Sequence, residues 1–364
     1  MGVPPAAELE QQIRFCTVGG HRVAYACAGS GPPLVLPAAL GASHLEVEWD
    51  FPDFRAFVAA LARHRTVVRY DRLGCGLSDR GPGATELGLA ASLRTLEAVV
   101  EATGAAELSL LGFSAGGATA VAYAAAHPGH VRALALVGAF AHGADVAPAP
   151  LREALVATVR AHWGAGSRLL TDVWIPGADG PARDRFARLQ RASADPETAA
   201  ALLEAVYATD VRAQAPRVRA PALVLHRRAD RAIPFAAGRE LAALVPGARL
   251  TGLDGDVHPP WLGDRAAVVS AVTAFLDAEH PVAGAAAPDV TARPAAPAAP
   301  SSPLSAREAE VLRLVAEGLS DREIAGRLVV SPHTVHRHVA NIRTKLDLPS
   351  RAAAATYAAR NGLI

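Results

Sequence analysis

The stretch 107–117 reads ELSLLGFSAGG, and it decides the fold of the larger part of the chain. An apolar run at 108–111 leads into Gly112-Phe113-Ser114-Ala115-Gly116, and small residues follow. This order predicts a strand, a tight turn that carries Ser114, and a helix. Glycine is needed on both sides because a Cβ there would collide with the neighbouring strand or helix. The helix N-terminus adds positive potential and free N–H groups, so the motif indicates a nucleophilic serine.

Short apolar runs without alternation recur along the chain, at residues 34–36, 66–70, 133–137 and 222–225. Such runs are typical of strands buried on both faces of a parallel sheet. Helical patterns lie between them, at 53–63, 86–103, 115–127 and 265–278, and Gly19-Gly20 joins a predicted hairpin of 14–18 and 22–26. The alternation predicts a doubly wound, mostly parallel α/β sheet. Residues 139–216 carry helical patterns without a clear strand, and we expect them to form a cap over the sheet edge.

A nucleophilic serine needs a base, and the base needs an acid that orients it. In this architecture the acid and then the histidine follow the serine along the chain. Asp230 comes just after the strand predicted at 222–225, where ligand-facing loops of α/β sheets lie. His258 follows another short strand, predicted at 249–253. We therefore expect Ser114, Asp230 and His258 to form a catalytic triad.

Other interpretations compete with this assignment. Asp230 also suits a turn or a helix cap, and His258 a surface loop. Asp254 and Asp256 are alternative acids, although they lie too close to His258 in the sequence to come from a separate strand end. His226 is expected to lie beside the acid loop rather than to act as the base.

Residues 14–279 resemble the α/β-hydrolase family. The resemblance rests on the serine motif, on YDRLGCGLS at 70–78, on the acid region 223–234 and on the histidine region 254–261. It implies an α/β-hydrolase fold with a helical cap, and a structural role for Asp71. Since the cap shows no obvious cation or anion clamp, the expected ligand is a neutral, mostly apolar ester, lactone or amide.

The chain departs from the family pattern just after residues 34–36. Relatives often carry His-Gly there, whereas this chain reads Pro37-Ala38-Ala39-Leu40-Gly41. Backbone N–H groups of Ala38 or Ala39, together with that of Ala115, are expected to form the oxyanion hole. Three nearby side chains are candidates for the pocket wall, with ordinary packing as the alternative: His44, Trp49 and Phe113.

A second unit follows a proline- and alanine-rich stretch at 280–303, which predicts an extended linker. Capping signals then open helices predicted at 306–317, 321–328 and 332–346, and a fourth helix is predicted at 350–360. The short turn between the second and third helices is typical of a helix-turn-helix. The predicted organisation is a hydrolase-like domain at 1–279 with its cap at 139–216, a linker at 280–303, and a small four-helix domain at 304–364.

The third of these helices carries polar and basic side chains largely outside its apolar stripe. A solvated helix face is the ordinary interpretation, but these groups also suit contacts with phosphates and base edges. The candidates for DNA contact are His333, Thr334, His336, Arg337, Asn341, Arg343 and Lys345.

Residues 301–364 closely resemble the LuxR-type helix-turn-helix domain. The resemblance is carried by LSxRExEVL at 304–312, GLSxREIA at 318–325, and Thr334-Val335 with Lys345-Leu346. It implies a transcriptional regulator that binds double-stranded DNA as a homodimer. The two copies are expected to contact each other through the fourth helix. His336 stands where relatives often have Lys or Arg.

Composition narrows the functional classes further. The chain is 51% hydrophobic and 20% charged with a net charge of +1, which excludes global disorder and demands no polyanionic partner. Three cysteines fit neither a disulfide framework nor a zinc site, and we expect no cofactor and no metal. Without a signal peptide or a membrane span in the sequence, a cytoplasmic protein is expected. The preferred function is a DNA-binding regulator whose hydrolase domain senses a small molecule and has the residues to hydrolyse it. The alternative is a working serine esterase with an appended DNA-binding domain.

Overall fold

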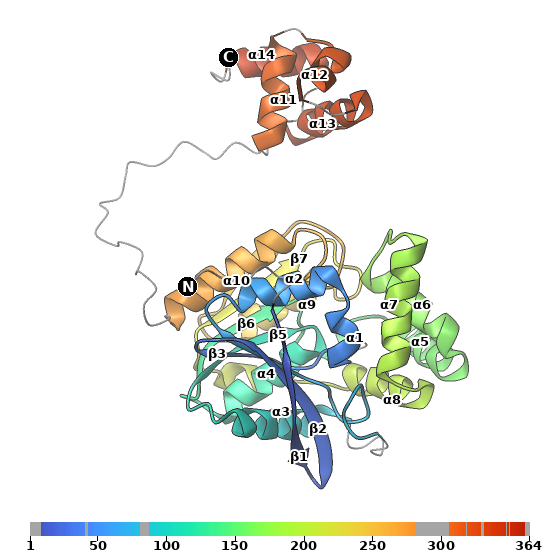
Figure 1. Ribbon diagram of the computed structural model, residues 1–364, viewed down its shortest axis with the longest axis vertical. Helices are drawn as coiled ribbons and strands as arrows, with labels where there is room; N and C mark the ends of the chain where they lie inside the picture. The colour runs from blue at the N-terminus through green and yellow to red at the C-terminus, as the bar shows by residue number, and fades with distance from the viewer. Residues whose placement is uncertain are drawn as a thin grey trace. The chain divides into compact units, whose positions relative to one another are not determined.

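The computed structural model describes residues 9–40, 43–80, 87–280, 306–317, 319–328, 331–346, 348 and 350–360. It divides the chain into two units, Met1–Ala285 and Ala286–Ile364 (Figure 1). Of the linker expected at 280–303, only His280 belongs to the described residues.

The larger unit is built on an eight-stranded sheet in the order β1-β2-β4-β3-β5-β6-β7-β8. Pairing is antiparallel from β1 to β2 and from β2 to β4, and parallel across the remaining strands. This is the mostly parallel sheet that the sequence predicts, and every predicted strand is present. The strands are β1 Gln12–Val18, β2 His21–Gly29, β3 Pro33–Leu36, β4 Thr66–Tyr70, β5 Leu108–Phe113, β6 Val131–Val137, β7 Ala222–Arg227 and β8 Arg249–Leu253.

Helices cover both faces of this sheet, which explains its unbroken apolar strands. Successive residues of β6 supply opposite faces: Leu134 and Leu136 pack in one apolar cluster, Ala133 and Ala135 in another. The first cluster includes residues of α3 Leu89–Thr103, α4 Ala115–Ala126 and α9 Phe235–Leu244. The second includes residues of α2 Pro52–Leu61 and α10 Arg265–Glu279. Two helices were not predicted, the five-residue α1 Leu45–Trp49 and α9.

Between β6 and β7 the chain forms four helices that lie together at one side of the sheet (Figure 1). They are α5 Ala149–Ala161, α6 Trp163–Trp174, α7 Gly180–Ser193 and α8 Pro196–Tyr207. The last two begin in the same way, because Asp179 and Asp195 each accept a hydrogen bond from a backbone N–H three residues on, and a proline follows in the first turn. Leu155, Val159 and Leu203 belong to an apolar cluster formed largely by these helices.

The smaller unit contains α11 Ala306–Ala316, α12 Asp321–Leu328, α13 Pro332–Lys345 and α14 Arg351–Arg360. All four contribute to one apolar cluster, with Val311, Ile324, Val335 and Ala354 among its buried members. Ser320 and Glu323 form the expected capping box, in which the Ser320 N–H donates to Glu323 Oε2 at 2.7 Å. None of the helices in the described parts of the chain is long and apolar enough to cross a membrane.

The backbones of β5 and α4 approach each other closely. A Cβ at Gly112 would lie 2.6 Å from Gly117 Cα, and a Cβ at Gly117 would lie 2.4 Å from Ala139 Cβ. Both distances are shorter than packed atoms tolerate, so only glycine allows this approach. The approach fixes α4 directly behind Ser114.

We predict that Gly117→Ala destabilises the larger unit by about 1–3 kcal/mol through overpacking, although alanine is the better helix former. All four tryptophans, Trp49, Trp163, Trp174 and Trp261, lie in this unit. Urea unfolding followed by tryptophan fluorescence therefore measures its stability. The control is Gly180→Ala in α7, where a Cβ meets no atom within 4 Å. Equal stability of the two variants would contradict the packing argument.

Candidate active site and DNA-binding face

Ser114 occupies a strained turn between β5 and α4. Its φ of 52° and ψ of −131° make it the one non-glycine residue with positive φ among the described residues. Its N–H donates to Val137 O at 3.1 Å, and its carbonyl accepts from Gly117 N at 2.9 Å. These bonds hold a conformation that is costly for a residue with a Cβ, and such strain is common at functional sites.

Asp230 and His258 are in direct contact and both are buried. His258 Nδ1 lies 2.8 Å from Asp230 Oδ2, while Asp230 Oδ1 accepts from the N–H groups of Ala232 and Ile233 at 2.9 and 3.2 Å. Burial acts to raise the pKa of Asp230. The charge of His258 and these hydrogen bonds outweigh burial, and the pKa is lower than usual. Asp230 is therefore an ionised acceptor that fixes the orientation of the imidazole.

The second ring nitrogen of His258, Nε2, is buried and has no hydrogen-bond partner among the described residues. The ring lies between the Phe113 ring, at a centroid distance of 4.7 Å, and Gly138, where a Cβ would be 3.2 Å from Cε1. An imidazole held at Nδ1 and unpartnered at Nε2 is ready to accept a proton.

The competing titratable residues are arranged differently. His226 Nε2 lies 2.8 Å from Ile233 O and 3.9 Å from Asp230 Oδ2, so His226 is a neighbour of the acid loop, as expected. Burial lowers the pKa of His226. The carboxylate that contacts His258 belongs to Asp230 and not to Asp254 or Asp256.

Residues 37–39, here called the oxyanion loop, lie against the N-terminus of α4. A Cβ at Gly116 would be 2.3 Å from Pro37 O and 3.4 Å from Ala38 O. Arg72 Nη2 donates to Ala38 O at 2.5 Å and holds the loop from the β4 side. The backbone of Ala38 and Ala39 is thus brought close to that of Ala115, the first residue of α4. Their role as oxyanion donors stays a prediction.

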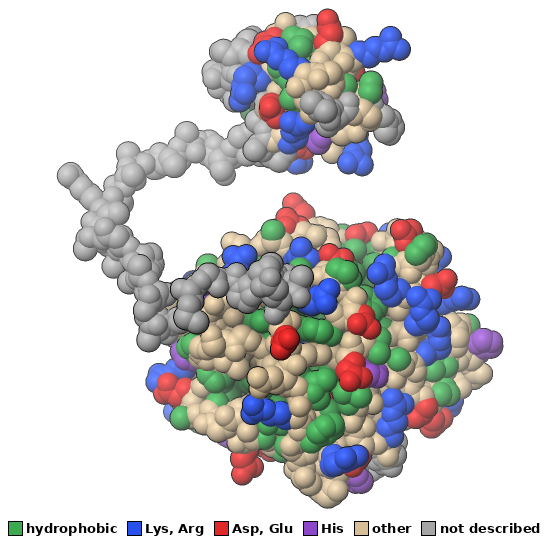
Figure 2. Space-filling view, in the orientation of Figure 1, with side chains coloured by type: hydrophobic (Ala, Val, Ile, Leu, Met, Phe, Trp, Pro, Cys, Tyr) green, Lys and Arg blue, Asp and Glu red, His purple; other side chains and the backbone are tan. Residues whose placement is uncertain are grey.

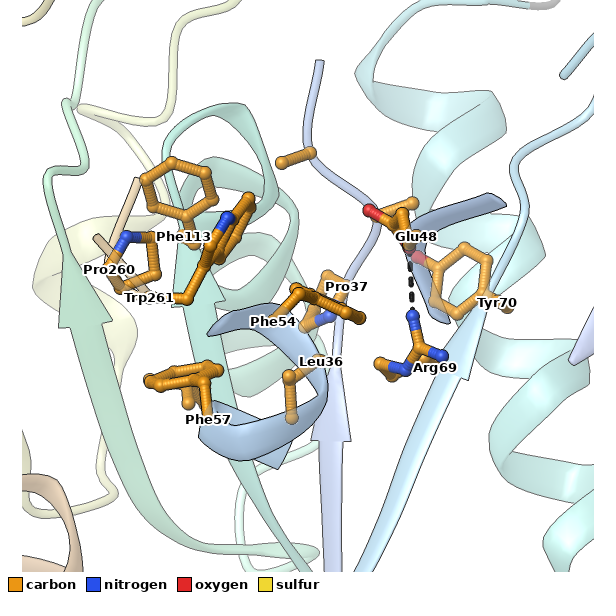
Figure 3. A pocket seen from close by; sticks show the side chains of 13 residues that line it. Leu36, Pro37, Glu48, Phe54, Phe57, Arg69, Tyr70, Phe113, Pro260 and Trp261 are labelled. Atoms are coloured by element: carbon orange, nitrogen blue, oxygen red, sulfur yellow. Dashed lines mark hydrogen bonds and ion pairs between the residues drawn. The ribbon is translucent and has the colours of Figure 1, made fainter. Parts of the chain in front are cut away.

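Next to this loop lies a cavity of about 60 Å³, here called the aromatic cavity (Figure 3). Its wall contains Phe54, Phe57, Phe113 and Trp261, with the rings of Phe54 and Trp261 edge to face at 5.0 Å. Ala38 and Ala39 also line it, so the oxyanion loop forms part of the wall. An aromatic or aliphatic group of a ligand would fit such a surface.

Two of the three predicted pocket residues have other positions. Phe113 lines the aromatic cavity, but His44 and Trp49 do not. His44 caps α1, since its Nδ1 accepts from Val47 N at 3.5 Å. The Trp49 ring lies against the Arg69 guanidinium, 5.4 Å from the ring centroid. The short helix α1, which was not predicted, accounts for both differences.

The wall of the aromatic cavity also contains a buried pair of titratable side chains, Glu48 and Arg69, which sequence reasoning missed. Arg69 Nη1 donates to Glu48 Oε2 at 2.8 Å, and both side chains are buried (Figure 3). Burial raises the pKa of Glu48 to about 8 against the opposing effect of Arg69. The two residues belong to α1 and β4, and nothing in the sequence pattern pairs them.

The third helix of the smaller unit presents several of the predicted DNA contacts at its surface. His336, Arg337 and Asn341 are exposed, and Thr334 is half-buried next to the helix cap Ser331. The side chain of His333 lies outside the described parts. Figure 2 shows Lys and Arg side chains at the visible surface of this unit.

Two predicted phosphate contacts have partners inside the unit. Lys345 Nζ lies 2.8 Å from Oε2 of Glu308, a carboxylate buried at the side of α11. Arg343 Nε donates to Leu348 O at 3.4 Å, just beyond the end of α13. Both cations therefore have a structural contact that helical periodicity alone did not indicate.

Comparisons with known proteins agree with this division of the chain. The protein-family model for the alpha/beta hydrolase fold matches residues 32–159. The family model for bacterial regulatory proteins of the luxR family matches residues 302–358. Pyrrolizixenacetamide deacetylase of Xenorhabdus hominickii is 30% identical over 242 residues, 65% of this chain and 88% of that protein. The transcriptional regulatory protein LiaR of Bacillus subtilis is 46% identical over 61 residues, 17% of this chain and 29% of LiaR.

Two further matches cover the hydrolase-like part. Polyketide synthase ThaQ of Burkholderia thailandensis is 32% identical over 268 residues, 71% of this chain, but this chain spans only 12% of its length. The enol-lactonase of Burkholderia xenovorans has a TM-score of 0.62 at 28% identity, over 72% of this chain and 99% of the enzyme. The matches confirm the predicted fold of both units.

We predict that Glu48 makes the stability of the larger unit pH-dependent. Its pKa rises on folding from 4.5 to about 8, so its contribution is complete below pH 4.5 and is lost as the pH rises through 8. In this window stability should fall by at most about 1.4 kcal/mol per pH unit on account of Glu48. Glu48→Gln should flatten the slope in urea titrations read by tryptophan fluorescence. The exposed neighbour variant Glu46→Gln should keep it, and an unchanged slope in Glu48→Gln would refute the assignment.

Proposed function

Because the chain belongs to the α/β-hydrolase family and carries a LuxR-family DNA-binding domain, we propose that it is a transcriptional regulator controlled by a small molecule. In this proposal the hydrolase domain binds the ligand and changes the affinity of the smaller domain for DNA. The observation that carries it is one chain that combines a LuxR-family domain with a largely apolar cavity lined by Phe113, the residue before Ser114. Binding at one site that alters another requires a difference in ligand affinity between two states of the protein.

The same site supports hydrolysis of the ligand. In the proposed reaction, His258 Nε2 accepts the proton of Ser114 Oγ as this oxygen attacks the ligand's carbonyl carbon. The N–H groups of Ala115 and of Ala38 or Ala39 stabilise the oxyanion, and Asp230 stabilises the imidazolium. His258 then gives the proton to the leaving group, and water hydrolyses the acyl-serine by the reverse sequence of proton transfers. The buried, unpartnered Nε2 and the contact with Asp230 are the geometric support.

The substrate class we propose is a neutral ester, lactone or amide with an apolar acyl or leaving group. The aromatic wall of the cavity supports the apolar part. Two similar proteins are named as a deacetylase of an acetamide and as an enol-lactonase, so their names refer to an amide and to a lactone as substrates of those proteins. The alternative function, a serine esterase that its second domain only anchors to DNA, uses the same residues.

We further propose that the protein acts in the cytoplasm and binds double-stranded DNA as a homodimer. The smaller unit supports contact through α13, with Arg337 and Asn341 exposed on it. A dimer would bring two such helices to successive half-sites.

Ser114 should react with a fluorophosphonate probe. We expect Ser114→Ala to abolish labelling and His258→Ala to reduce its rate by orders of magnitude, because members of a triad act as a unit. Ser270→Ala, at an exposed serine of α10, is the matched control and should label normally. Labelling is measured by intact-protein mass spectrometry. A folded wild-type protein that stays unlabelled would argue for a receptor without catalysis.

Arg337→Ala should weaken binding to double-stranded DNA. If Arg337 contacts one phosphate, its loss lowers the slope of log affinity against log salt by about one unit. Arg313→Ala removes an exposed arginine of α11 and should leave both affinity and slope almost unchanged. Fluorescence anisotropy with random-sequence duplex DNA over a salt series provides the measurement. Equal effects of both variants would contradict the assignment of α13 as the DNA-contacting helix.

A further inference from the structure

A second cavity lies between the cap helices and the loops that follow β3 and β4. Trp163 and Trp174, the first and last residues of α6, contribute to its wall together with Leu202 and Leu203 of α8. We call it the cap cavity. Its free volume of about 20 Å³ accommodates one small polar group. Most of its wall is apolar, so any polar atom that faces it has few possible partners.

Two polar side chains of this wall are buried and incompletely paired. Arg72 Nε and Gln190 Oε1 have no hydrogen-bond partner among the described residues, and their side chains belong to residues only 8% and 1% exposed. Buried groups of this kind are normally paired, so an unpaired donor and an unpaired acceptor in one cavity indicate a missing partner.

The remaining contacts fix both groups in place. Gln190 Nε2 donates to Ser167 O and to Thr171 Oγ1, each at 2.8 Å. The carbonyl of Ser167 can only accept, so the amide nitrogen must lie there and the oxygen must face the other way. The Arg72 guanidinium is held by the bond from Nη2 to Ala38 O. The cap cavity thus has one fixed N–H donor and one fixed oxygen acceptor.

We propose that the cap cavity recognises a secondary amide group of the ligand, with its carbonyl oxygen on Arg72 Nε and its N–H on Gln190 Oε1. The inference rests on the proposed function, because it concerns the ligand of the same hydrolase domain. An ester offers no hydrogen to Gln190, and a carboxylate would place a second acceptor against it. Apart from Arg72, the titratable group in the wall is the Cys75 thiol, whose pKa burial raises to about 12, so it stays neutral.

The two cavities have one wall residue in common. Ala39 lines both, so in this proposal a ligand with its amide in the cap cavity would place its apolar group toward the oxyanion loop and the aromatic cavity. The cap cavity also contacts both sides of the candidate reaction centre. Arg72 holds Ala38 of the oxyanion loop, and the Trp174 carbonyl accepts from His258 N at 2.7 Å. Amide binding would therefore act directly on residues that contact Ala38 and His258, the candidate partners of Ser114.

The test compares N-benzylacetamide with benzyl acetate. The two probes differ only in that the amide N–H of the first is an ester oxygen in the second. Both are titrated into full-length protein carrying Ser114→Ala, so that neither is hydrolysed, and binding is read from the total tryptophan fluorescence, to which Trp163 and Trp174 of the cavity wall contribute. We expect the amide to bind roughly tenfold more tightly, because the ester leaves the Gln190 oxygen unpaired. This comparison requires no change in the cavity and remains decisive if cavity variants fail to fold.

A pair of variants then locates the preference. Gln190→Met should reduce the amide-to-ester ratio to about one. Gln214→Met, at another glutamine with an unpartnered buried Oε1 that lines neither cavity, should keep the ratio. If the protein with Gln190 and Gln214 unchanged binds both probes equally, or binds neither, the proposal is overturned. A bridging water is then the partner of Arg72 Nε and Gln190 Oε1. Since the titration needs neither Ser114 reactivity nor DNA, its failure is distinct from a failure of fluorophosphonate labelling.

Discussion

The contact between the backbones of β5 and α4 is the constraint on which the larger unit depends. Gly112 allows this contact, Gly117 allows α4 to pack against Ala139 just after β6, and Gly116 allows the oxyanion loop to lie against the first turn of the helix. The chain between strand and helix is then too short for a relaxed turn, and Ser114 takes up the strain with a φ of 52°. A side chain at Gly116 would force the oxyanion loop away from the first turn of the helix. The backbone, and not the hydroxyl, therefore determines where Ser114 lies.

A network of hydrogen bonds around Asp71 and Arg72 extends this constraint to the cap. Asp71 is fully buried and accepts from the N–H groups of Leu45 and Leu77, which fixes the loops around it, as expected for a structural residue. The neighbouring Arg72 holds Ala38 of the oxyanion loop. The chain continues to Gly76, whose N–H donates to Ser193 O at the end of α7. One loop thus joins the sheet, the oxyanion loop and the cap helices, and hydrogen bonds connect the cap to the residues around Ser114.

The sequence predicted those features that depend on local pattern or on chain order. Buried strands are recognisable because both faces are covered, and Ser114, Asp230 and His258 follow strands in the expected order. It missed features that depend on contacts between distant segments. Glu48 and Arg69 meet only because α1 packs beside β4, and α1 is too short to show a helical period. Lys345 lies on the polar face of α13 as expected, but periodicity within one helix cannot reveal that Glu308 of α11 meets it.

These missed contacts share a physical cause that bears on function. A buried charge or amide must find a partner, and in the described core that partner usually comes from another element: Arg69 for Glu48, and Ser167 and Thr171 for the nitrogen of Gln190. The exceptions are informative because unpaired burial costs free energy that selection can remove by a single apolar substitution. Arg72 Nε and Gln190 Oε1, both in residues that line the cap cavity, keep that cost in the folded chain. A polar atom that is retained, buried and unpaired next to a cavity is best explained by a partner that arrives with the ligand, which links the stability of the empty protein to its capacity to respond.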